Sequence, residues 1–474
     1  MTESDIRQRA RLVEHSLKDT LASFPEAVSI LEYAHLCTPV PDGERTVPSW
    51  SDALETALRE NTHVYFPSAP DAQPYFFHRT VTVPSARYIE CDPTATLCMT
   101  APAETVLFRN EHIVDGTRVR EEEQDVPRDH DIYLTGGRFV DPHTSRAGYG
   151  KSGMLDPARY AEHFHGVSTM LFFNHIDRLY IAHAAFVHCA AFAIQCGDIT
   201  HAAFLHIAFD DCFADGVHIG GNSRNLCIRD IRGVVGDDLV ALNLYDWQDS
   251  SVNFGPMDCV WCENLRQSPE SPYKAMRIEP GVYRYADGST VDCALTNAVI
   301  EDVRGVMTYK MYFQTPRYFV RREEPESGTP GSGDNIYFHN IDIDLTGPID
   351  RLPDYVNGDP VTGAFAAFEV GANIGHLTLS DIRLTLHREK YPHAYLLAIG
   401  PKSVRIDRGT PDEFEIFDPQ VSCTLQHLTL KNIRINGESI PLSALPAYIR
   451  EIRFDDIYRD GTATGSGEIA AVTE

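Results

Sequence analysis

Apolar residues recur at a fixed spacing through most of the chain. Three windows of 17 residues, at 179–195, 203–219 and 226–242, align without gaps, and their starts lie 24 and 23 residues apart. A fourth window, 298–314, repeats the third closely, with IEDVRGV standing against IRDIRGV. The windows are β-rich and lack helical periodicity, so each repeat predicts one coil that stacks on the next through parallel hydrogen bonds. The sequence therefore predicts an all-β protein, a parallel β-helix of about nine or ten coils.

The N-terminal segment follows a different pattern. Residues 4–22 have the apolar spacing of an amphipathic helix, and a second, short helix is predicted at 49–60. A stacked coil needs a neighbour that covers its open end. We therefore expect residues 1–60 to form a helical cap that leads into the coils, and residues 61–474 to form the β-helix domain that carries the chemistry.

Composition and charge narrow the range of partners. The net charge of −27, from 41 Lys and Arg against 68 Asp and Glu, repels phosphate backbones and anionic lipids. We find no apolar stretch long enough to span a membrane and no signal-peptide pattern, so we expect a cytoplasmic protein with no nucleic-acid or membrane partner. The 11 cysteines indicate buried apolar residues in a reducing compartment. The oligomeric state stays open.

Acidic residues gather at one offset of the repeat. In the aligned windows Asp215 and Asp238 share a position, and Asp237 comes directly before Asp238. An insertion of three residues in the next coil brings Lys274 into the same column, and the fourth window brings in Lys310. Equal offsets in stacked coils become neighbours about 4.8 Å apart. A GDD sequence alone is often a structural corner, but stacked carboxylates favour paired acid and base groups of the kind that glycoside hydrolysis requires.

These motifs carry a family resemblance. Residues 131–320 resemble glycoside hydrolase family 28, the polygalacturonases and their relatives, within the pectin-lyase-like superfamily of right-handed parallel β-helices. The resemblance rests on ADG at 214–216, NLCI at 225–228 and GDD at 236–238. It implies that Asp237 is the general acid, and that Asp215 and Asp238 activate water and invert the anomeric configuration. The sequence departs from the family at Phe213, where the family has asparagine, and in lacking the family's GHG histidine.

The candidate substrate-binding residues lie in the coils after the acidic pair. Arg277 lies in MRIEPG, where the family has a related basic motif. We expect an oligosaccharide to contact Lys274, Arg277, Tyr309 and Lys310. The three cations among them favour a uronate as the bound sugar. No metal and no cofactor are expected. The eight histidines between 163 and 218 are interpreted as surface or groove residues rather than metal ligands.

Several other functions stay open at this stage. A polysaccharide lyase on the same scaffold would use the three aspartates to hold Ca²⁺ and a basic side chain to remove a proton. A sugar transferase or epimerase would use the same groove. A β-helix that only binds carbohydrate would not need the carboxylates for catalysis.

Overall fold

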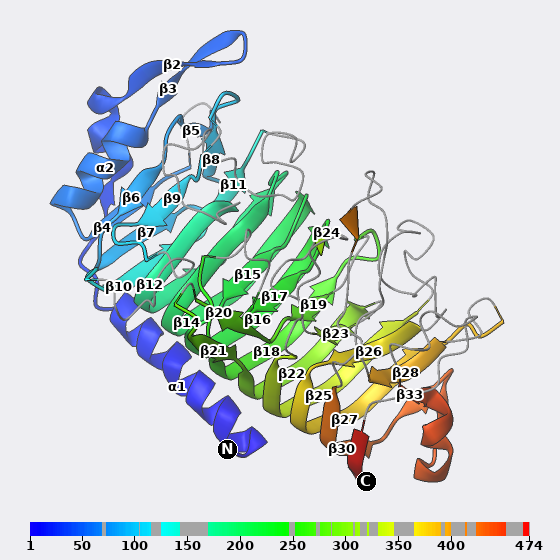
Figure 1. The fold of residues 1–474 in the computed structure, drawn as a ribbon. Helices are drawn as coiled ribbons and strands as arrows, with labels where there is room; N and C mark the ends of the chain where they lie inside the picture. Colours follow the sequence, from blue (N-terminus) through cyan, green and yellow to red (C-terminus); the bar gives the residue numbers. More distant parts are fainter. Residues whose placement is uncertain are drawn as a thin grey trace.

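The computed structural model describes residues 1–473 except 69–72, 104, 115–124, 143–168, 246–251, 272–274, 286, 307–308, 313–319, 322–329, 346–364, 390–393, 400–412, 415–422 and 452–467. Strands dominate the described chain, and they stack in parallel into one right-handed β-helix (Figure 1). The prediction of an all-β, right-handed parallel β-helix is confirmed. Among the described residues, no helix combines the length and the apolarity that a membrane crossing needs.

The longest ladder forms one face of the β-helix. Each of its strands pairs in parallel with the next. In order these strands are β1 (Val28–Ser29), β4 (His63–Phe66), β7 (Arg87–Cys91), β10 (Asp129–Thr135), β12 (Thr169–Ala182), β14 (Phe192–Cys212), β16 (Ser223–Val235), β18 (Met257–Gln267), β22 (Leu295–Val306), β25 (Ser332–Asp344), β27 (Asn373–Thr385), β30 (Thr424–Lys431) and β34 (Glu468–Thr473). From β10 onward the described part of this ladder holds ten strands, in agreement with the expected number of coils.

A second ladder carries the candidate site. It contains β6 (Val81–Val83), β9 (Phe108–Asn110), the first residues of β12 and β14, β15 (Val217–Gly220), β17 (Val240–Asn243), β19 (Met276–Ile278), β23 (Tyr309–Tyr312), β26 (Phe365–Gly371), β28 (Ala394–Ile399) and β33 (Ile449–Glu451). The third ladder is shorter and contains β3 (Arg45–Ser49), β5 (Tyr75–Phe77), β8 (Thr96–Met99), β11 (Arg138–Val140) and β13 (Ala185–Val187). It continues through the last residues of β14, β16 and β18, where Phe209 pairs with Gly233 and Gly233 with Gln267.

Some short pairs of strands are antiparallel. They are β2 (Thr38–Asp42) with β3, β20 (Gly281–Arg284) with β21 (Thr290–Cys293), β24 (Val320–Arg321) with β29 (Glu413–Phe414), and β31 (Arg434–Ile435) with β32 (Glu438–Ser439). Two 3₁₀ helices, η1 (Ile30–Leu36) and η6 (Leu442–Tyr448), lie near the two ends of the stack.

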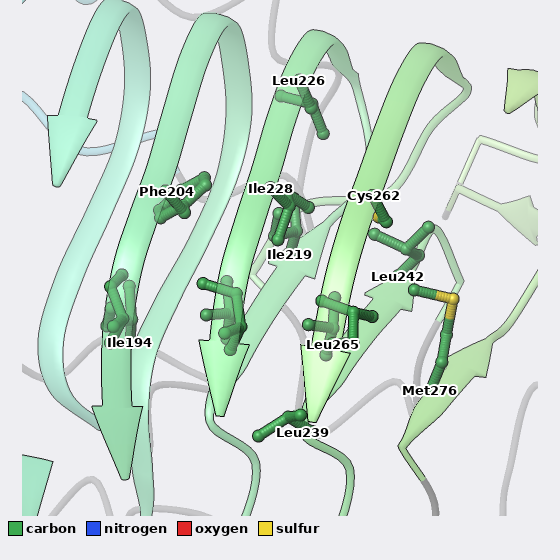
Figure 2. Packing of buried hydrophobic residues seen from close by; sticks show 14 of the residues in the cluster. Ile194, Phe204, Ile219, Leu226, Ile228, Leu239, Leu242, Cys262, Leu265 and Met276 are labelled. Atoms are coloured by element: carbon green, nitrogen blue, oxygen red, sulfur yellow. The ribbon is translucent and has the colours of Figure 1, made fainter. Parts of the chain in front are cut away.

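The interior of the β-helix is a stack of apolar side chains. Figure 2 shows Phe204, Ile228 and Cys262 facing Ile219, Leu242 and Met276 across it, so strands of the first two ladders share one core. Every second residue of β15 and β17 points into this core, and the residues between them point outward. The 11 cysteines are free, and all but Cys37 are buried, in agreement with their expected apolar role.

The corners between ladders are formed by residues with positive φ. One column of such corners contains His183, His206, Asp230, Asn264, Asp302, Asn340, Asp381 and Asn432, all at matching offsets of successive coils. Asn, Asp and His are the non-glycine residues that adopt this conformation most readily. His175, His188 and His201 also have positive φ. These five of the eight histidines between 163 and 218 therefore have a local structural role as corner residues.

The two N-terminal helices occupy different places. Helix α2 (Ser51–Glu60) buries Ala53, Leu54, Ala57 and Leu58 in the main core, at the end of the stack. Helix α1 (Glu3–Leu21) instead lies along the flank of the coils, where Figure 1 shows it crossing the first ladder. It buries Ile6, Ala10, Val13 and Leu17 against an outward-facing apolar column. That column contains Tyr88, Tyr133, Tyr180, Ala203, Cys227, Trp261 and Val299.

This arrangement differs from the expected cap. Only α2 lies at the end of the core, because the first ladder presents its own apolar stripe on the outside and α1 is what covers it. Two ion pairs, of Arg7 with Glu301 and of Glu14 with Arg229, hold the helix there, and Glu3 contacts His339. Since α2 and later strands share one hydrophobic core, the division into domains at residue 60 stays a prediction.

Candidate active site

The three aspartates come from two equivalent turns of adjacent coils. Asp215 lies between β14 and β15, whereas Asp237 and Asp238 lie between β16 and β17. Val217 pairs with Val240, so Asp215 and Asp238 occupy the same offset, as the repeat predicted. The backbone N–H of Asp238 donates to Asp215 Oδ1 at 3.0 Å, and the N–H of Gly216 donates to the Asp238 carbonyl at 2.9 Å. Stacking of the coils therefore brings the carboxylates together.

Glycine is required at the start of the GDD turn. A Cβ atom at Gly236 would lie 2.0 Å from the carbonyl oxygen of Phe213 in the preceding coil. The N–H of Gly236 also donates to the Cys212 carbonyl at 2.7 Å. This close approach of two backbones keeps the turns in register and so fixes the separation of the carboxylates that follow.

Burial separates the three carboxylates. Asp215 and Asp238 are completely buried, whereas Asp237 is only partly buried. Each of the three offers a carboxylate oxygen within 4.8 Å of the other two. Asp237 Oδ1 is itself a buried atom and has no hydrogen-bond partner among the described residues. Asp237 is therefore the acid best placed to meet a bound molecule.

Asp215 is held by His218. The imidazole Nδ1 lies 2.7 Å from Asp215 Oδ2, and its ring stacks on Phe192 with 4.2 Å between ring centroids. His218 is 1% exposed, unlike the corner histidines, so its interpretation as a surface or groove residue is wrong. The alternation of β15 was the available signal, because His218 lies between the core residues Val217 and Ile219 and therefore faces outward.

Arg277 lies among three acids. Its Nε lies 2.8 Å from Asp238 Oδ2, its Nη2 3.6 Å from Asp215 Oδ2, and its Nη1 3.7 Å from Glu279 Oε1. The guanidinium is nearly buried and Glu279 is completely buried. Sequence reasoning missed Glu279, which follows Arg277 by two positions on the same outward face. A contact between Arg277 and a substrate stays a prediction.

The surroundings favour an ionised Asp215. Burial by itself would raise the pKa of this carboxyl, but the hydrogen bond with His218 and the charge of Arg277 outweigh burial and lower the pKa below its usual value. His218 and Arg277 thus favour the charged form of Asp215. Asp215 is therefore suited to act as a base or to position water, and not to donate a proton.

The remaining predicted residues are placed in part. Lys274 lies outside the described residues, although the pairing of Val240 with Met276 agrees with the insertion of three residues that we expected. Lys310 and Tyr309 lie in β23, of which only the backbone is described, and they pair with Arg277 and Met276.

The expected column position of Lys310 is therefore wrong. Lys310 continues the column of Arg277 and not that of Asp238. Ala241 and its partner Arg277 are 36 residues apart, whereas Arg277 and Lys310 are 33 apart. An alignment without gaps through the turn before β23 conceals this difference in coil length. The roles of Lys274, Tyr309 and Lys310 stay predictions.

The donor set fits a divalent cation poorly. Three carboxylates within 4.8 Å could ligate Ca²⁺, which prefers six to eight oxygens. However, Arg277 already places a positive charge against Asp238 and Asp215, and Asp215 accepts from both His218 and the Asp238 backbone. A metal ion would have to displace this arginine or lie against it.

Comparison with known proteins finds distantly similar structures but no family. No family model matches the chain, and no curated protein does. Solved structures that resemble it include an exopolygalacturonase from Thermotoga maritima, with a TM-score of 0.48, 11% identity, and coverage of 90% of this chain and 97% of the other. The polygalacturonase of Erwinia carotovora ssp. carotovora gives a TM-score of 0.45 and 9% identity, over 90% of this chain and 98% of the other.

The solved structures that resemble this chain also include an adhesin. The surface protein and adhesin PfbA of Streptococcus pneumoniae gives a TM-score of 0.44 and 9% identity, over 94% of this chain and 100% of the other. The similar structures thus include both glycosidases and an adhesin. They do not decide between catalysis and binding, and membership of glycoside hydrolase family 28 stays a prediction.

Proposed function

We propose that the chain is a glycoside hydrolase that cleaves an oligosaccharide, with Asp237 as the general acid and Asp215 and Asp238 activating water. The observation that carries the proposal is the unequal treatment of the three carboxylates. Two are completely buried against Arg277 and His218, and the third is only partly buried. Glycoside hydrolysis needs this separation into one proton donor and one ionised partner.

A purely structural explanation of the cluster is weaker. Burying ionised groups costs several kcal/mol per ion, and a well-packed apolar replacement is often at least as stable. Four acids and one arginine at a single corner therefore need a functional reason. A β-helix that only binds carbohydrate would not need one carboxylate to differ from its neighbours.

The burial of Asp215 and Asp238 bears on whether hydrolysis inverts or retains the anomeric configuration. Asp215 and Asp238 are completely buried, so a small water molecule reaches them more readily than the carbon of a sugar ring. This favours inversion, which the family resemblance also implies. The nearest carboxylate oxygens lie within 4.8 Å, however, which is closer than the roughly 6.5–9.5 Å between carboxyl groups that inverting enzymes usually show. The anomer that is formed first, followed by NMR, decides between the two outcomes.

The test of the proposal is a screen of aryl glycosides and oligosaccharides with wild-type protein and Asp237→Asn. We expect the variant to lose about 10²–10⁴-fold in turnover with little loss of binding. Asp211→Asn is the matched control, because Asp211 is exposed, lies four residues before Asp215 and pairs only with His188 among the described residues. Near-normal turnover by Asp237→Asn on an unactivated substrate would remove the assignment.

A chelator control addresses the lyase alternative. The grouping of three carboxylate oxygens is what keeps that alternative open. A lyase product absorbs in the ultraviolet, and its formation would stop when Ca²⁺ is removed. A hydrolase product does not absorb, and we expect hydrolysis to continue in the presence of EDTA.

A further inference from the structure

We propose that the sugar ring bound beside Asp237 is uncharged, and that the site selects against a uronate at this position. The inference rests on the proposed hydrolase function and names the class of its substrate. It replaces the uronate expected from the basic residues of the sequence, because the structure shows what one of those residues contacts.

The guanidinium of Arg277 faces carboxylates of the protein itself. Its three nitrogens face three different carboxylates: Nε faces Asp238, Nη2 faces Asp215 and Nη1 faces Glu279. An arginine that recognises a substrate carboxylate presents a free pair of N–H groups to it. Here each edge of the guanidinium already has an acidic neighbour within 3.7 Å, and the side chain is 8% exposed. The positive charge of Arg277 is therefore already balanced by carboxylates of the protein.

Glu279 is the residue that decides this balance. Without it, Arg277 would keep Nη1 for a ligand. With it, the described part of the site holds three acids besides the proton donor Asp237, namely Asp215, Asp238 and Glu279, around one arginine. An additional carboxylate on the bound ring would meet an excess of like charge in a largely desolvated place, where such a juxtaposition is costly.

The apolar neighbour of the acids fits a neutral ring. Phe213 lies two residues before Asp215, in the same turn, and it is 48% exposed. Among the described residues it is the one aromatic side chain in the group of exposed large hydrophobics. An aromatic ring offers a flat surface to the C–H face of a sugar. The same turn thus presents an apolar surface and acids, and no basic side chain.

The experiment compares neutral glycosides with uronides of the same ring configuration, such as a nitrophenyl galactoside and the matching galacturonide. We expect kcat/KM to be at least about tenfold higher for the neutral member of each pair. Glu279→Gln should move this ratio about tenfold toward the uronide, because it removes a negative charge and releases Nη1 of Arg277. Glu263→Gln is the control, since Glu263 pairs with Arg229 on the first ladder, and it should leave the ratio unchanged.

A second measurement needs no variant. Salt screens repulsion, so added salt should raise kcat/KM for the uronide and leave the neutral glycoside unaffected. A preference for the uronide, or a fall of its kcat/KM with salt, would overturn the inference and leave the hydrolase proposal standing. If neither member of the pair is hydrolysed, the hydrolase proposal fails. Calorimetric binding of the neutral glycoside and of the matching uronide then still tests the inference. Tighter binding of the neutral one supports it, and tighter binding of the uronate or binding of neither contradicts it.

Discussion

Replacing Arg277 by methionine should destabilise the protein strongly. Arg277 Nε lies 2.8 Å from Asp238 Oδ2. At an effective dielectric constant of about 20, two unit charges at that distance attract by about 6 kcal/mol, most of which offsets the desolvation of the two ions. Methionine retains the packing volume but leaves Asp238 and Asp215 without their cation. Removing one partner of a buried pair costs about 3–5 kcal/mol, and we expect a loss of this size in the free energy of unfolding.

Urea unfolding at neutral pH measures this loss. Arg266→Met is the matched control, because Arg266 pairs with Asp302 at 2.8 Å with both side chains at least one-third exposed, and such a pair contributes about 1 kcal/mol or less. Adding Asp238→Asn to Arg277→Met should recover part of the loss, since one uncompensated charge is then removed. A loss for Arg277→Met no larger than that of the control would show that the buried acids are not held by Arg277.

Three further outcomes follow from the same structure. Leu17→Ala should lower the free energy of unfolding by about 2–5 kcal/mol, whereas Leu12→Ala, on the exposed face of α1, should change it little, as urea midpoints will show. His218→Ala should raise the pKa of Asp215, because only Arg277 and the Asp238 N–H then oppose the effect of burial, so the acid limb of kcat/KM against pH should move to higher pH. An unmoved limb, or an equal shift in His218→Gln, which can still donate, would contradict this role. Because folding lowers the pKa of Asp215, its contribution to stability is present above the unfolded pKa of about 3.9 and is lost as pH falls through the folded pKa. Urea midpoints measured from pH 7 to pH 2 should show that this loss is absent in Asp215→Asn.

The stacking of the carboxylates could be predicted because a solenoid converts sequence offset into position. Asp215 and Asp238 share an offset of 23 residues, and the strands that follow them pair with the same offset. The prediction for Lys310 failed at the turn before β23, since strand residues keep a regular spacing and turns do not. Register can thus be carried from one strand to its equivalent only when the turn between them keeps its length.

Partners within the site were harder to predict. Alternation shows that His218 and Glu279 face outward, but it does not show that they are buried or what they contact. The place of α1 was missed for a related reason, because an amphipathic pattern shows that one face is buried and not against which surface. The outward column with Tyr88, Tyr133 and Tyr180 was the available signal, since three stacked tyrosines on the outside of a coil need a cover.

The other corners of the β-helix show what a structural acid looks like in this protein. Asp230 and Asp302 occupy equivalent corners of the first ladder, remain 28% and 33% exposed, and accept hydrogen bonds from the asparagine of the next coil. Such corners satisfy a carboxylate at the surface, with an asparagine and a neighbouring histidine or arginine, at little electrostatic cost. Asp215 and Asp238 are instead completely buried and need a buried arginine and a buried histidine. A chain that can build its corners from Asp–Asn pairs does not need this arrangement for folding, which supports the proposed role of Asp237 beside it.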